Sequence, residues 1–143
     1  MSLAAVLASS GMPRADDLQP PTRQRVADRA EIQRLLTDHT LYGYYVGGQS
    51  WAEYHSPDGR TAYEENNCVY AGHWWIESGL VCFRYEAFNQ GQPACFQLYR
   101  LGERLEFDYR QGSNNWKLNA YTVARIPGNP DRMPLEGQSC VGV

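Results

Sequence analysis

The stretch GHWWIESGLVCFRYE, residues 72–86, decides the fold, because two runs with a period of two flank a Ser-Gly pair. Such a period is typical of a β-strand, in which successive side chains point to opposite faces of the sheet. A two-residue loop at 78–79 makes the two runs a hairpin, with Ile76 opposite Val81. The stretch therefore predicts an antiparallel sheet, and its aromatic residues either form the core or line a ligand site.

A third run, ACFQLYR at 94–100, continues this register. If the loop at 87–90 closes the next hairpin, Cys82 lies opposite Cys95. One face of the three strands then carries the apolar set Trp74, Ile76, Val81, Phe83, Phe96 and Leu98. The other face carries His73, Trp75, Arg84 and the two cysteines. In a closed barrel one of these faces is the interior, and the sequence does not decide which one.

The rest of the chain repeats the pattern of short runs and turns. We expect strands at 40–46, 50–55, 60–66, 73–77, 80–86, 94–100, 104–110 and 116–126. The turn glycines Gly59, Gly79 and Gly102 are spaced like the turns of successive hairpins, and no long crossover separates the runs. The fold class predicted is mainly β: an up-and-down antiparallel meander of about eight strands, forming a lipocalin-like barrel or a strongly curved sheet.

One helix is expected before the strands, in TRQRVADRAEIQRLLTDHT. Its apolar residues can share one face, with the arginines in water. Two N-caps are open: Thr22, which gives a helix over 23–37, and Asp28 with Glu31 in a capping box, which places the firm part at 29–37. We therefore expect three regions: 1–21 as a disordered tail or signal-peptide remnant, 22–126 as one helix-plus-barrel domain, and 127–143 as a Pro/Gly-rich tail packed on it.

Length, charge and hydropathy exclude several classes of protein. A chain of 143 residues is long enough for one domain with its own core. A net charge of −3 is too small for a nucleic-acid footprint, so no nucleic-acid partner is expected. No apolar run approaches the length of a membrane span.

The four cysteines predict a disulfide framework in an exported protein. Their spacing contains no CxxC pair, so no structural zinc site is expected. An even count in a small chain permits two bridges. The strand register pairs Cys82 with Cys95, which leaves Cys68 for Cys140. If the protein is cytosolic, the four remain thiols.

The sequence supplies no positive evidence for catalysis, so no catalytic residue, metal ligand or cofactor is assigned. The three histidines have no metal-ligand spacing, and we expect His39 at the helix end and His55 exposed at a strand end. Glu53, Asp58, Glu64 and Glu65 could gather at one barrel end. The neighbours Glu64 and Glu65 nevertheless point to opposite faces and cannot form a carboxylate pair.

The segments AEIQRLLTDHTLYG, EYHSPDGRTAY and GHWWIESGLVCFRYE, followed by ACFQLYR, resemble a family of small exported bacterial proteins of unknown function. The shared pattern is an ordered set of PDG, GxWW, LCF (LVCF at residues 80–83 of this chain) and a later Cys, and the resemblance covers about residues 29–101. It implies a lipocalin-like β domain and a periplasmic or secreted location. It implies no activity, and it does not include Cys68 and Cys140.

Three functions remain open. The first is binding of a small apolar or amphipathic ligand, lined by Tyr42, Tyr44, Tyr70, Trp74, Phe83, Phe96 and Tyr109. The second is an envelope protein–protein interaction module with a filled barrel, whose outer contacts are Trp75, Arg84 and Tyr99. The third is an enzyme built in the barrel mouth.

Overall fold

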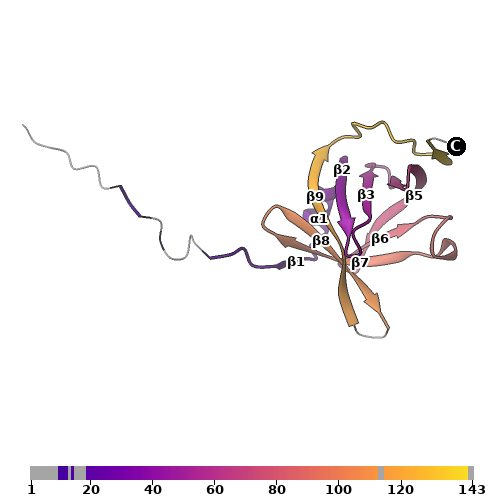
Figure 1. The fold of residues 1–143 in the computed structure, drawn as a ribbon. Coiled ribbons are helices and arrows are strands. Elements are labelled where there is room, and N and C mark those ends of the chain that lie inside the picture. Colours follow the sequence, from indigo (N-terminus) through magenta and orange to yellow (C-terminus); the bar gives the residue numbers. More distant parts are fainter. Residues whose placement is uncertain (1–9, 13, 15–18, 113–114, 142–143) are drawn as a thin grey trace, which may run out of the picture.

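A closed barrel of eight antiparallel strands forms the body of the protein (Figure 1). The computed structural model describes residues 10–12, 14, 19–112 and 115–141. The barrel strands are β2 (His39–Tyr45), β3 (Ser50–His55), β4 (Arg60–Glu65), β5 (Cys68–Glu77), β6 (Leu80–Arg84), β7 (Ala94–Leu101), β8 (Arg104–Gln111) and β9 (Asn115–Pro127). Each strand pairs with the next one along the chain, and β9 pairs with β2 to close the barrel. The predicted up-and-down barrel is confirmed.

The register predicted from the hairpin at 72–86 is also confirmed. Ile76 pairs with Val81 across the β5–β6 turn, and Cys82 pairs with Cys95 across β6 and β7. The turn residues Ser78 and Gly79 have φ angles of 50° and 74°, as a two-residue hairpin loop between twisted strands requires.

The apolar face of these strands is the interior of the barrel. Trp74, Ile76, Val81, Phe83 and Leu98 all belong to one core cluster and are at most 8% exposed. The opposite face, with the two cysteines, lies outside. The sequence did not decide which face of the sheet is the interior. Closure of the barrel decides it, because only one face of a closed sheet points inward.

The helix α1 (Arg29–Leu36) is the shorter of the two helices that the sequence allows. Asp28 is its N-cap and accepts a hydrogen bond from the backbone N–H of Glu31, at 3.1 Å. The longer helix over 23–37 is wrong: residues 24–26 form strand β1 (Gln24–Val26), which pairs with β7. Asp28 itself has extended backbone angles, so the helix cannot continue through it toward the N-terminus.

Two short terminal strands lie next to β6, where they fill the edges of β5 and β7 that β6 does not cover. We call this region the seam. β6 has five residues, and it pairs with β5 only at 73–77 and with β7 only at 94–96. β1 occupies the edge of β7 beyond one end of β6, and β10 (Gln138–Cys140) occupies the edge of β5 beyond the other. Backbone groups that the short strand leaves open are thereby paired.

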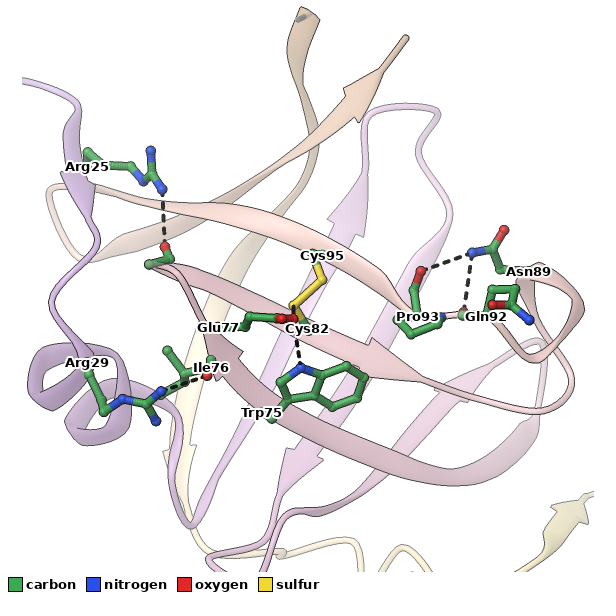
Figure 2. Close-up of a disulfide and its surroundings, with 11 residues drawn as sticks. Arg25, Arg29, Trp75, Ile76, Glu77, Cys82, Asn89, Gln92, Pro93 and Cys95 are labelled. Carbon is green, nitrogen blue, oxygen red and sulfur yellow. Dashed lines mark hydrogen bonds between the residues drawn. A yellow bond between two sulfur atoms is a disulfide. The ribbon is translucent and has the colours of Figure 1, made fainter. Parts of the chain in front are cut away.

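Both predicted disulfides are present, and both lie at this seam. Cys82–Cys95 joins β6 to β7 (Figure 2), and Cys68–Cys140 joins β5 to β10. Between β9 and β10, Met133 is buried on the outer face of the barrel against Tyr54.

The strand directions give the barrel two different ends. One end holds α1, where Arg29 donates to the carbonyl of Ile76 at 2.8 Å (Figure 2) and Arg125 donates to the carbonyl of Leu35 at 3.3 Å. The other end holds the turns at 46–49 and 66–67 and the loop at 85–93. Within the described part of the chain, no helix has the length and apolar character needed to cross a membrane.

Candidate functional site

A cavity of about 230 Å³ enters the barrel at the end away from α1. Its lining comes from seven of the eight barrel strands' ends and from the loop at 85–93: Tyr45, Trp51, Glu53, Tyr63, Glu65, Phe83, Tyr85, Phe88, Asn89, Gln92, Ala94, Phe96, Phe107, Asn119 and Ala120. Most of these residues are aromatic, and the two carboxylates, Glu53 and Glu65, come from β3 and β4. This combination of an apolar wall and a few placed polar groups is typical of a small-molecule site.

The apolar wall is a continuous chain of rings. Trp51 meets Phe107 edge to face with ring centroids 6.2 Å apart, and Phe107 meets Phe96 in the same way at 6.1 Å. Phe96 in turn meets Phe83 at 5.9 Å. Edge-to-face contacts stabilise such clusters and fix the ring planes, so this wall has a defined shape.

Glu53, which also lines the cavity, is the centre of a buried polar network. Its two carboxylate oxygens contact Nε2 of His55 at 2.9 Å and the hydroxyl of Tyr85 at 2.6 Å. Tyr85 also contacts the hydroxyl of Thr61 at 3.0 Å. Glu53 is 7% exposed and His55 is not exposed at all, so each polar atom here needs a partner inside the protein.

The hydrogen bonds of His55 fix the charge of this network. Its Nδ1 lies 3.2 Å from the carbonyl oxygen of His39, which only accepts, so Nδ1 carries a proton. A hydrogen bond between Nε2 and Glu53 therefore needs one further proton, on either the imidazole or the carboxyl group. In both cases the pair of His55 and Glu53 is neutral as a whole, which lowers the cost of its burial.

A second polar group lies nearer the mouth. The Tyr45 and Tyr63 hydroxyls are hydrogen-bonded to each other, and Tyr63 donates to Glu65 at 2.7 Å. Because the single Tyr63 proton goes to Glu65, Tyr45 is the donor to Tyr63. Gln49 also donates to Glu65, at 3.4 Å.

The tyrosines of the cavity stay protonated. Burial, and then the charges of Glu53 and Glu65, raise the pKa of Tyr45 to about 12 against an opposing hydrogen bond with Tyr63. Burial and the neighbouring Glu53 also hold the pKa of Tyr85 well above its usual range, and burial raises the pKa of Tyr63 as well. Their hydroxyls therefore act as neutral donors and acceptors.

The loop at 85–93 covers one side of the mouth. Phe88 packs against Tyr70 with ring centroids 4.8 Å apart, and against Tyr63 at 5.6 Å. Asn89 and Gln90 have positive φ angles of 50° and 56°, and the Asn89 amide donates to the carbonyls of residues 92 and 93 (Figure 2). The loop thus holds its own shape, and the Cys82–Cys95 disulfide lies between the strands at its base.

The structure brings only some of the predicted ligand residues to the cavity. Phe83 and Phe96 line it. Tyr70 and Tyr109 stand behind the lining, against Phe88 and Phe96 respectively. Trp74 is deeper in the core, where its indole donates to the Ser56 carbonyl at 2.9 Å and its ring meets His55.

Two predicted residues lie on the outside of the barrel. Tyr42 donates to Asp131 at 2.5 Å, and Tyr44 is 39% exposed. Both border a surface depression that also contains Glu64. Glu64 and Glu65 are thus on opposite faces, as their adjacent positions predicted.

From the sequence, Glu53 and Glu65 were expected only as acidic residues that could gather at one barrel end, and the tyrosines of the cavity were missed. The expectation that His55 is exposed is wrong: Trp51, Glu53 and His55 alternate along β3, so all three point inward. That alternation was the available signal. His39, expected at a helix end, begins β2, where its Nδ1 lies 2.8 Å from the carbonyl of Thr37.

The outer-face contacts predicted for an interaction module are partly engaged within the chain. The Trp75 indole donates to Glu77 at 3.3 Å beside the Cys82–Cys95 disulfide (Figure 2). The Arg23 guanidinium lies 3.7 Å from the centre of the Tyr99 ring. Glu77, Cys82 and Cys95 bring ligand atoms close together, but the two sulfurs are bonded to each other and offer no thiolate to a metal.

Comparisons of the chain with protein-family models, with curated proteins and with solved structures found no match.

Proposed function

We propose that the protein binds a small apolar or amphipathic molecule inside its barrel. The observation that carries this proposal is the cavity, whose lining combines an edge-to-face aromatic wall with a few polar groups. Barrels of eight strands are wide enough either to be filled by side chains or to hold one small ligand. A cavity of about 230 Å³ is smaller than the roughly 300–1,000 Å³ of drug-sized sites, so the ligand is a small one.

The proposed location is the periplasm or the cell exterior. Two disulfides support it, because such bonds form and persist in oxidising compartments. The resemblance of residues 29–101 to small exported bacterial proteins agrees with this location.

Native mass spectrometry of protein purified from an oxidising compartment tests the proposal. We expect a native mass greater than the denatured mass by the mass of one small molecule. The variant Ala94→Phe fills part of the cavity, because Ala94 lies on its lining. It should lose the added mass, whereas Ala87→Phe, on the exposed part of the loop, should retain it. A native mass without any addition, together with no binding of added apolar probes, would contradict the proposal.

The alternative, an envelope interaction module with a filled barrel, has less support. Its contacts Trp75 and Tyr99 already have partners in the chain, and the barrel contains the cavity described above. A native mass equal to the denatured mass would support this alternative.

A further inference from the structure

The cavity carries an acidic lining without a basic counterpart. Glu53 and Glu65 both contribute to it, and the other residues that line it include no Lys, Arg or His among the described residues. A cavity that exposes carboxylates to its contents favours a positively charged ligand and disfavours an anion, because like charges repel strongly where little water separates them.

The two carboxylates are not equivalent. Glu53 shares a proton with His55, so that pair is neutral and both Glu53 oxygens already have partners. Glu65 has only the neutral donors Tyr63 and Gln49 among the described residues. No basic side chain lines the described cavity beside the half-buried Glu65 carboxylate. The uncompensated charge of the cavity therefore lies at Glu65.

From these contacts we infer that the ligand is a small organic ammonium ion, whose charged end contacts Glu65 and whose apolar body lies against the aromatic wall. This inference rests on the proposed function and adds the chemical class of the ligand. An ammonium group would meet a carboxylate and the faces of electron-rich rings, both of which attract cations. The Trp51, Phe83, Phe96 and Phe107 rings would contact the body.

The tyrosine hydroxyls support the same ligand charge. Burial and then the charges of Glu53 and Glu65 raise the pKa of Tyr45 to about 12, with the Tyr63 hydrogen bond opposing the shift. Burial disfavours any charge here, whereas the share of the shift that comes from the carboxylates disfavours only an anion and favours a cation. Tyr45 donates its hydroxyl hydrogen bond to Tyr63, and Tyr63 donates its own to Glu65. The remaining lone pairs of both hydroxyl oxygens can therefore accept a hydrogen bond from an ammonium N–H.

A matched set of three probes tests the inference on the full, oxidised chain. The probes are 2-phenylethylammonium, 2-phenylethanol and phenylacetate, which share an aromatic body and differ in the charge of their polar end. Isothermal titration calorimetry should show that the ammonium binds about tenfold or more tightly than the alcohol, the difference that a hydrogen bond to a charged group makes. Phenylacetate should bind most weakly.

Two variants locate the charge. Glu65→Gln keeps the shape of the side chain and should reduce the affinity for the ammonium by about tenfold while leaving that for the alcohol unchanged. The alcohol thus reports that the cavity is intact. The matched control Glu64→Gln makes the same change at the next residue, on the outer face, and should alter neither affinity.

The possible results separate this inference from the proposed function. If the alcohol or phenylacetate binds as tightly as the ammonium, or if Glu65→Gln leaves the ammonium affinity unchanged, the inference is overturned and ligand binding stands. If none of the three binds and the native mass carries no addition, both are overturned. A molecule that the protein retains from the cell supports the inference if it contains a basic nitrogen and overturns it otherwise.

Discussion

At the scale of single residues, Gly43 shows how closely the barrel interior is packed. A Cβ atom added at this position would lie 2.6 Å from the Trp51 ring and even closer to the carbonyl oxygen of Tyr121. Gly43 also lies where the register between β2 and β9 shifts. The absence of a side chain therefore lets Trp51 lie against the backbone of β2, and this position fixes one wall of the cavity.

We expect Gly43→Ala to lower the free energy of unfolding by about 1–3 kcal/mol, because the methyl group must displace either the Trp51 ring or the β2–β9 backbone. Urea denaturation followed by circular dichroism measures the change. The matched control is Gly47→Ala, where the added Cβ atom would meet no atom within 4 Å. This control should change stability by less than about 0.5 kcal/mol. Equal effects of the two substitutions would show that the close approach at Gly43 is not important.

At the scale of secondary-structure elements, the seam beside β6 is where the barrel depends on its termini. β6 leaves parts of β5 and β7 unpaired, and the three-residue strands β10 and β1 fill these places. Strands this short have little stability of their own. The Cys68–Cys140 disulfide therefore holds β10 against β5.

Replacing Cys68 and Cys140 together by Ala should lower the free energy of unfolding by about 4 kcal/mol, the loop-closure value for bridged residues 72 apart. The change should be local at first. Hydrogen exchange should become fast for Ala71, whose N–H donates to the carbonyl of residue 137 at 3.0 Å, while β3 and the paired part of β6 stay protected. If exchange rose equally across the barrel, β10 would not be an element that detaches from β5 by itself.

Most of these elements could be predicted from the sequence. Alternation and turn residues located all eight barrel strands, and the hairpin at 72–86 gave the register that pairs Cys82 with Cys95. β1 and β10 could not be found in this way, because three residues are too few to show a period. β1 is a strand only because β6 leaves an edge of β7 unpaired, and β10 only because β6 leaves an edge of β5 unpaired. The longer of the two predicted helices was wrong for the same reason, since residues 24–26 pair with β7 instead.

At the scale of the whole molecule, the candidate site was harder to predict than the fold. Alternation along β3 places Trp51, Glu53 and His55 on one face. Whether that face is solvated or buried depends on closure between β2 and β9, which lie at opposite ends of the sequence. A glutamate and a histidine on an alternating strand usually indicate the solvent side, and here they lie inside. The aromatic residues Phe83 and Phe96 were found because their face was apolar throughout.

The buried tyrosines also make the stability of the whole barrel depend on alkaline pH. Burial, with added effects of Glu53 and Glu65, raises the pKa of Tyr45 in the folded state from 10.0 to about 12. A raised pKa means that the folded state holds the proton more tightly than the unfolded state does. The resulting stabilisation is complete below pH 10 and is lost as the pH rises toward 12, by about 3 kcal/mol for Tyr45 alone.

We therefore expect the free energy of unfolding to fall as the pH increases above 10, and to fall less steeply in Tyr45→Phe, which has no hydroxyl to ionise. At pH 7 this variant should be less stable by about 1 kcal/mol, because its hydrogen bond with Tyr63 is lost. Urea denaturation at a series of pH values gives both quantities, and tyrosinate absorbance recorded with near-ultraviolet circular dichroism shows when the rings ionise. Tyr63 and Tyr85, whose pKa values burial also raises, should ionise only as the barrel unfolds. If all ten tyrosines ionised while the circular dichroism stayed native, the cavity hydroxyls would be open to solvent and the polar side of the site would not be the dry, acidic surface that an ammonium ligand needs.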